Sequence, residues 1–187
     1  MTIEEQRLLE TAKYEEAHRH PKYNMKDWRQ AIVRNWLRAP WPSGLTFLDV
    51  GCGKAETLDI AKGLAIDARG CDIVSYLAER DDVDLIEGAH DLPYMDEEFD
   101  LTSCNDVLEH IIEEDVPAVL REIRRVTRHG ILLGISRKPG PLHITIKSEE
   151  WWMEKIWENM AGEASIVCAE EIPRVKQPYT WVEIQCG

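Results

Sequence analysis

The chain has 187 residues, of which 44% are hydrophobic and 30% charged, and its formal net charge is −13. This length suits a single domain with a buried core, and no apolar run reaches the roughly 18 residues that a membrane-spanning helix needs. The negative charge would repel a phosphate backbone, so DNA and RNA are disfavoured as substrates. The five cysteines form no CxxC pair, which indicates neither a zinc site nor a disulfide framework.

Residues 1–43 are predicted to form helices that cover the core, residues 44–187. The segment Met1–Glu5 is acidic and lacks the basic-then-apolar order of a secretion signal, so we expect a soluble, cytoplasmic protein. One apolar stripe has the spacing of a helix face: Trp28, Ala31, Ile32 and Trp36. The segment is either an amphipathic cover packed on the core or a lid over a ligand, with Tyr23 as the residue of interest.

Residues 45–55 predict a buried strand that runs into a glycine turn and then a helix. The strand is a short apolar run between Gly44 and Gly51, as expected for a central parallel strand covered on both faces. Gly51 and Gly53 allow a tight turn and a close approach of the backbone to a ligand. The helix that follows points its free N–H groups at that ligand, which predicts a nucleotide-type site.

The residues around this turn distinguish between two kinds of nucleotide cofactor, a dinucleotide and S-adenosylmethionine. A dinucleotide fingerprint requires G-x-G-x-x-G, whereas the sixth position here is Glu56. Glu56 and Asp49 are both negatively charged and would repel a pyrophosphate bound at this turn. S-adenosylmethionine carries an ammonium and a sulfonium instead of phosphates, so the local charges favour that cofactor.

The segment Leu48–Gly53, which reads Leu-Asp-Val-Gly-Cys-Gly, resembles the first motif of class I S-adenosylmethionine-dependent methyltransferases. Ala55 stands where a third glycine is common. The resemblance implies a doubly wound, Rossmann-like α/β fold with a seven-stranded, mostly parallel sheet. It also implies cofactor contacts from four residues of the motif: Asp49, Gly51, Cys52 and Gly53.

A helix is predicted over 56–68, followed by a strand that ends at Gly70–Ile73. Asp72 lies about 20 residues beyond the motif, the distance at which a βαβ unit places an acid on a ribose. Asp72 is therefore predicted to accept hydrogen bonds from both ribose hydroxyls, and Ile73 to pack on the adenine. The alternative is an aspartate in a surface turn.

The third strand, 84–88, leads into the segment Asp91–Tyr94, which reads Asp-Leu-Pro-Tyr. The class often has an acid followed by Leu-Pro-aromatic at this place. By that resemblance, the Asp91 carboxylate accepts from the adenine amino group, and the Leu92 backbone N–H meets a ring nitrogen. The alternative is that Asp91 only stabilises a turn before proline.

The fourth strand, 101–105, continues into a segment that resembles the Leu-Glu-His of many class I methyltransferases. The resemblance places Asn105 near the methionine part of the cofactor. Asp106 and Glu109 have the spacing of a capping box, so a helix is expected to begin there. His110 is either a general base or a packing residue.

The remaining predicted elements follow in the order typical of class I methyltransferases. An amphipathic helix is predicted over 117–127, a buried strand over 131–136, and a loop rich in basic residues that includes His143. Ser148 is predicted to cap a tryptophan-rich helix, and a reversed strand pair at 165–168 and 180–185 completes the sheet. The tryptophans are read as core filling, a dimer surface, or a platform for a sugar or aromatic substrate.

The sequence therefore predicts a methyltransferase that acts on an oxygen or nitrogen of a small-molecule or glycan-type acceptor. An oxygen acceptor needs a base, and His110 and His143 are the candidates. No metal is expected, and the chain is either monomeric or a homodimer. Two alternatives remain: a non-catalytic or partner-activated S-adenosylmethionine-binding subunit, and a nicotinamide-dependent dehydrogenase, against which the glycine spacing and Asp49 argue.

Overall fold

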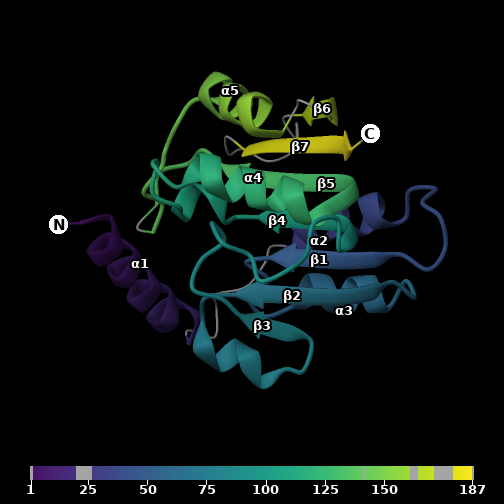
Figure 1. Cartoon of the computed structure of the whole chain (residues 1–187), viewed down its shortest axis with the longest axis horizontal. Coiled ribbons are helices and arrows are strands. Elements are labelled where there is room, and N and C mark those ends of the chain that lie inside the picture. Colours follow the sequence, from purple (N-terminus) through teal and green to yellow (C-terminus); the bar gives the residue numbers. More distant parts are fainter. Residues whose placement is uncertain (1, 20–26, 141, 161–163, 171–178, 187) are drawn as a thin grey trace.

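The computed structural model describes residues 2–19, 27–140, 142–160, 164–170 and 179–186 (Figure 1). Tyr23 lies outside these residues. The helices of the described part are α1 (Ile3–His18), α2 (Asp27–Leu37), α3 (Glu56–Lys62), α4 (Val116–Val126) and α5 (Glu149–Met160), with 3-10 helices η1 (Ser75–Glu79) and η2 (Leu108–His110). The strands are β1 (Thr46–Val50), β2 (Asp67–Asp72), β3 (Val83–Leu85), β4 (Phe99–Asn105), β5 (Thr127–Ser136), β6 (Ala164–Glu170) and β7 (Tyr179–Cys186).

The described strands lie in one sheet in the order β3-β2-β1-β4-β5-β7-β6. The strands from β3 to β5 pair in parallel, whereas β7 is antiparallel to β5 and β6 is antiparallel to β7. The order reverses between β1 and β4, which is where a doubly wound sheet opens a crevice at the carboxyl ends of its strands. The predicted Rossmann-like α/β fold with a mostly parallel sheet is confirmed.

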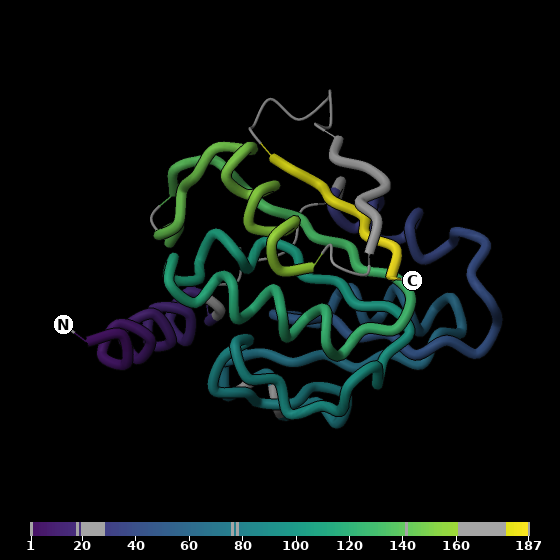
Figure 2. The backbone as a smooth tube through the Cα atoms, turned by 45° about the horizontal axis from the view of Figure 1, so that its top comes forward, coloured from purple at the N-terminus to yellow at the C-terminus, as the bar shows by residue number. Residues whose placement is uncertain are grey.

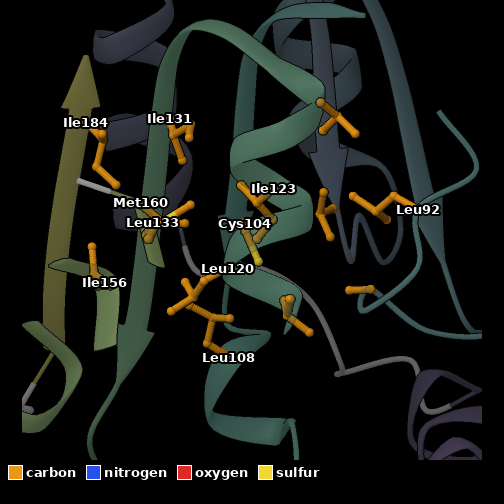
Figure 3. Close-up of a cluster of buried hydrophobic side chains, with 14 of the residues drawn as sticks. Leu92, Cys104, Leu108, Leu120, Ile123, Ile131, Leu133, Ile156, Met160 and Ile184 are labelled. Atoms are coloured by element: carbon orange, nitrogen blue, oxygen red, sulfur yellow. The ribbon is translucent and has the colours of Figure 1, made fainter. Parts of the chain in front are cut away.

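Helices cover both faces of the sheet and bury a separate apolar cluster on each (Figure 1). On one face, α4 and α5 place Leu120, Ile123 and Ile156 against β4 and β5 (Figure 3). On the other face, Val33 and Trp36 of α2 pack with Leu58 of α3. Because both faces are covered, every residue of β4 is buried, as expected for a central parallel strand.

Local sequence explains where several elements begin and end. In α1, Thr2 and Glu5 form a capping box, which satisfies two free amide groups of the first turn. The Ser148 hydroxyl accepts a hydrogen bond from the Trp151 amide at 3.3 Å, which confirms the predicted cap of α5. The helix expected over 56–68 is shorter, because α3 ends at its C-cap residue Gly63.

The expected helix at Asp106 is wrong. Asp106 has a left-handed backbone with φ of 56°, and only the three-residue η2 follows, without a side-chain cap. The Glu109 side chain turns into the interior instead, where its Oε1 accepts from the Ser136 amide at 3.1 Å. A tertiary contact therefore replaces the predicted capping box.

Helix α1 lies beyond the carboxyl ends of the parallel strands, at the end of the molecule opposite the C-terminus (Figures 1 and 2). Its Arg7 binds both carboxylate oxygens of Asp115, at 2.8 and 2.6 Å. At its other end, Glu15 Oε1 accepts from the Ser75 amide at 2.6 Å. Helix α1 thus bridges the end of β2 and the start of α4. None of the described helices combines the length and the apolar character of a membrane span.

Candidate active site

A cavity of about 870 Å³, counting its open mouth, lies between α1 and the carboxyl ends of β1, β2 and β4. Its lining comes from six places along the chain: Arg7, Glu10, Thr11 and Tyr14; Gly51; Asp72 and Ile73; residues 86–90; residues 106–107 and 110–112; and Val119. The cavity therefore occupies the crevice that the strand order creates.

The glycine turn forms the floor of the cavity. Gly51 has φ of 70°, a conformation that side-chain-bearing residues rarely adopt, and its amide donates to the Cys71 carbonyl at 2.8 Å. Gly53 also has a positive φ, of 51°. Ala55, where a third glycine was expected, adopts φ of 60° as well and is completely buried. The turn keeps its shape in spite of the alanine.

Asp72 ends β2 and ties the glycine turn to the next strand. Its Oδ2 accepts from the Gly53 amide at 2.8 Å and its Oδ1 from the Val74 amide at 3.0 Å. Each carboxylate oxygen has two lone pairs, so Asp72 can still accept hydrogen bonds from a ligand. Asp72 and Ile73 both line the cavity.

Asp49 lies beneath the turn and is 3% exposed. Burial raises its pKa from 3.8 to about 7, although hydrogen bonds from Ser103 and Thr57 favour the charged form. Cys52 is also buried, which raises the pKa of its thiol. Asp49, Cys52 and Gly53, which were predicted to contact the cofactor, are not among the lining residues of the cavity.

Two predicted adenine contacts do not face the cavity. Asp91 is exposed and is not a lining residue. Leu92 is 3% exposed in the core, and its amide already donates to Glu122 Oε2 at 2.8 Å, which conflicts with the predicted bond to adenine. Because Leu92 points into the core, its neighbour Asp91 points outward. The lining segment is instead residues 86–90, a few positions earlier than predicted.

Asn105 is 7% exposed and also lies outside the lining residues. Neither polar atom of its side chain has a hydrogen-bond partner within the described part of the chain. Its place at the cavity is taken by Asp106, which pairs with Arg29 at 2.5 Å. The left-handed backbone of Asp106 turns the chain toward the cavity, a feature that sequence spacing did not reveal.

His110 lines the cavity and is oriented by a backbone carbonyl. Its Nδ1 is 2.9 Å from the Leu142 carbonyl, to which the Tyr14 hydroxyl also donates at 3.2 Å. Because a carbonyl can only accept, Nδ1 carries the hydrogen, and the lone pair of the neutral ring is at Nε2. The ring packs edge-to-face on Tyr14 and on His143, with centroids 5.1 and 4.7 Å apart.

His143 has the same arrangement: its Nδ1 is 2.6 Å from the Lys138 carbonyl. It contacts His110 without lining the cavity itself. Burial raises the pKa of both neighbouring acids, Asp106 and Glu109. The negative charge of Asp106 raises the pKa of Glu109 further. Arg29 acts in the opposite direction on Asp106, because its positive charge favours the charged form of that carboxylate. Three side-chain atoms lie within 4.8 Å of one another, one each from Glu109, His110 and His143.

Sequence reasoning did not identify the residues of α1 that line the cavity. Arg7, Glu10, Thr11 and Tyr14 lie three or four residues apart on one helix face, and all line the cavity. The face mixes charged, polar and aromatic side chains, so no apolar stripe marks it in the sequence. Helices were expected over residues 1–43 as a cover or a lid, but no pattern in the sequence indicated which side chains would face the cavity.

A doubly wound sheet with a glycine turn after its first strand and an acid at the end of the next defines a nucleotide-cofactor protein of the Rossmann-like class. Residues 48–134 match the family described as "methyltransferase domain". Over these residues, which run from β1 into β5, the chain is similar to methyltransferase domains, whose methyl donor is S-adenosylmethionine. No curated protein sequence matches the chain closely enough to count as a relative.

Three solved structures share the fold. A 1,6-didemethyltoxoflavin N1-methyltransferase of Burkholderia thailandensis, with that compound and S-adenosylhomocysteine bound, is 15% identical over 100% of this chain and 91% of its own, with a TM-score of 0.77. A putative methyltransferase of Haloferax volcanii in complex with the activator Trm112 is 14% identical over 85% and 89%, with a TM-score of 0.66. Magnesium protoporphyrin IX methyltransferase of Synechocystis PCC 6803, with S-adenosylmethionine bound, is 20% identical over 85% and 80%, with a TM-score of 0.61. At these identities the likeness shows the fold.

Proposed function

We propose that this enzyme methylates an oxygen or nitrogen nucleophile of a small-molecule acceptor that binds beside His110. The observation that carries the proposal is one continuous cavity, which joins the cofactor turn at Gly51 to the oriented imidazole of His110. The cavity also suits the cofactor, because Gly51 lines it and Asp72 offers acceptor oxygens to a ribose. The tryptophans of α5 do not line the cavity, which favours a small molecule over a stacked glycan.

Within this proposal the residues have distinct tasks. Gly51 and Asp72 hold the methionine and ribose parts of the cofactor, and Ile73 packs on its adenine. When bound, S-adenosylmethionine supplies the methyl group to the nucleophile. The protein aligns the acceptor with the methyl carbon and keeps water out, which is most of what an in-line displacement requires. His110 takes the proton of a hydroxyl acceptor at Nε2, and His143 supports its ring.

The proposal is tested with radiolabelled S-adenosylmethionine and a panel of small alcohols, phenols, amines and oligosaccharides. For a hydroxyl acceptor, His110→Ala is expected to lower kcat by about 10²- to 10⁴-fold, because the general base is lost, while cofactor affinity stays the same. His129→Ala is the matched control, since His129 is 46% exposed and is not a lining residue. Equal rates for His110→Ala and the wild type would contradict the assignment.

A partner-activated enzyme is the second candidate, and the Haloferax volcanii complex with Trm112 favours it. Trp157 of α5 is 61% exposed and offers a surface for a partner or a second copy of this chain. The acceptor panel separates the candidates: a chain that binds the cofactor but methylates none of the compounds alone supports activation by a partner.

The N-terminal segment 1–43 is proposed to act as a lid over the core 44–187, whose complete sheet has seven strands. The support is that α1 lines the cavity and is held by the two bonds from Arg7 to Asp115. Arg7→Ala is expected to raise the dissociation rate of the cofactor about three- to tenfold, because a bidentate pair of partly buried groups is lost.

Stopped-flow displacement of a fluorescent S-adenosylhomocysteine analogue measures this rate. Arg19→Ala is the control, because Arg19 is on the same helix and its pair with Glu15 is longer, at 3.7 Å, with the arginine side chain 72% exposed. A dissociation rate for Arg7→Ala equal to that for Arg19→Ala would argue against the lid.

A further inference from the structure

The adenine end of the cavity lacks the acid that was expected to recognise the base. The edge of adenine that carries the 6-amino group needs a hydrogen-bond acceptor. Asp91 is exposed outside the cavity, and the amide of Leu92 is bound to Glu122. The loop after β3 therefore does not supply the predicted pair of contacts.

Helix α1 carries a carboxylate into the same cavity. Glu10 is 8% exposed and lines the cavity. Its Oε1 accepts from Lys13 Nζ at 2.6 Å, whereas its Oε2 is buried and has no hydrogen-bond partner among the described residues. A buried carboxylate oxygen without a partner costs free energy, which a hydrogen-bond donor on a ligand would offset.

Glu10 lies in the middle of α1, on the helix face that lines the cavity. Arg7, one turn earlier, is bound to Asp115 at the start of α4, and Glu15, farther along, is bound to Ser75 after β2. Glu10 lies between these two anchors. The cavity also has apolar lining residues, which suit a flat ring: Ile73, Ile86, Ala89, Ile112 and Val119.

We propose that Glu10 accepts a hydrogen bond from the 6-amino group of the cofactor's adenine and thereby selects adenine among purines. The acid that recognises the base comes from the N-terminal helix rather than from the loop after β3. This proposal rests on the cofactor cavity described above. It also gives α1 a role in recognition as well as in closure.

The test pairs one protein change with one ligand change. The ligands are S-adenosylhomocysteine and its 6-deamino analogue, in which hydrogen replaces the amino group, and calorimetry measures both affinities. Glu10→Met keeps the length of the side chain and the helix propensity but removes the acceptor. We expect the wild type to prefer S-adenosylhomocysteine by about tenfold or more, and Glu10→Met to bind both ligands equally.

Two matched variants serve as controls. Glu87→Met removes another carboxylate of the cavity wall, one that is exposed, and Asp91→Asn removes the acid expected from the sequence. Both are expected to keep the wild-type preference. The role of Glu10 is overturned if Glu10→Met still prefers S-adenosylhomocysteine, or if Glu87→Met or Asp91→Asn loses that preference. Either result leaves the cofactor cavity itself in place. A wild type that binds neither ligand overturns the cofactor cavity and the role of Glu10 together.

Discussion

Replacing Asp72 with alanine is expected to weaken S-adenosylmethionine binding by about 100-fold or more. The carboxylate is 7% exposed at the end of β2 and lines the cavity next to Gly51. Hydrogen bonds to a charged acceptor contribute about 1.5–3 kcal/mol each, and a ribose offers two hydroxyl donors. Alanine also removes the bonds that Asp72 accepts from the Gly53 and Val74 amides, so the turn itself loosens.

Calorimetric titration with S-adenosylmethionine and S-adenosylhomocysteine measures this effect, alongside the thermal midpoint of each variant. Asp67→Ala is the matched control, because Asp67 begins the same strand but is exposed and distant from the cavity lining. Asp72→Asn keeps one acceptor oxygen and is expected to fall between alanine and the wild type. An affinity close to that of the wild type in a folded Asp72→Ala would remove the ribose assignment.

Gly51→Ala is expected to cost stability and cofactor binding together, whereas Gly44→Ala costs stability alone. Both glycines have left-handed backbones, with φ of 70° and 79°, so alanine at either position costs about 1–2 kcal/mol of unfolding free energy. A Cβ at Gly51 would overlap Cγ2 of Val107, whereas a Cβ at Gly44 meets nothing within 4 Å. Overpacking adds about 1–3 kcal/mol at Gly51.

Urea unfolding and cofactor titration of the two variants separate backbone strain from steric overlap. The loss of unfolding free energy in Gly51→Ala beyond that in Gly44→Ala measures the steric overlap with Val107. The double variant Gly51→Ala with Val107→Ala is expected to recover much of this extra loss. Cofactor affinity should fall only where Gly51 is changed, because Gly51 lines the cavity. Equal losses in stability for the two single variants would show that Val107 moves aside freely.

The sequence by itself determined the class of fold and the cofactor turn. The apolar run before Gly51 predicted a strand covered on both faces, and the glycines predicted a tight turn. These features are local, because they depend on residues within a few positions of one another. The place of Asp72 at the end of β2 was predictable for the same reason, since the length of one βαβ unit fixes its distance from the turn.

The tertiary structure alone decided which side chains line the cavity. Asp91 follows the expected pattern, yet the burial of Leu92 against α4 turns it outward. Asp106 and Glu109 have the spacing of a capping box, but Arg29 and the Ser136 amide bind them instead. Helix α1 reaches the cavity through anchors at Asp115 and Ser75, far away in the sequence. Such contacts depend on how distant elements pack, which spacing along the chain does not encode.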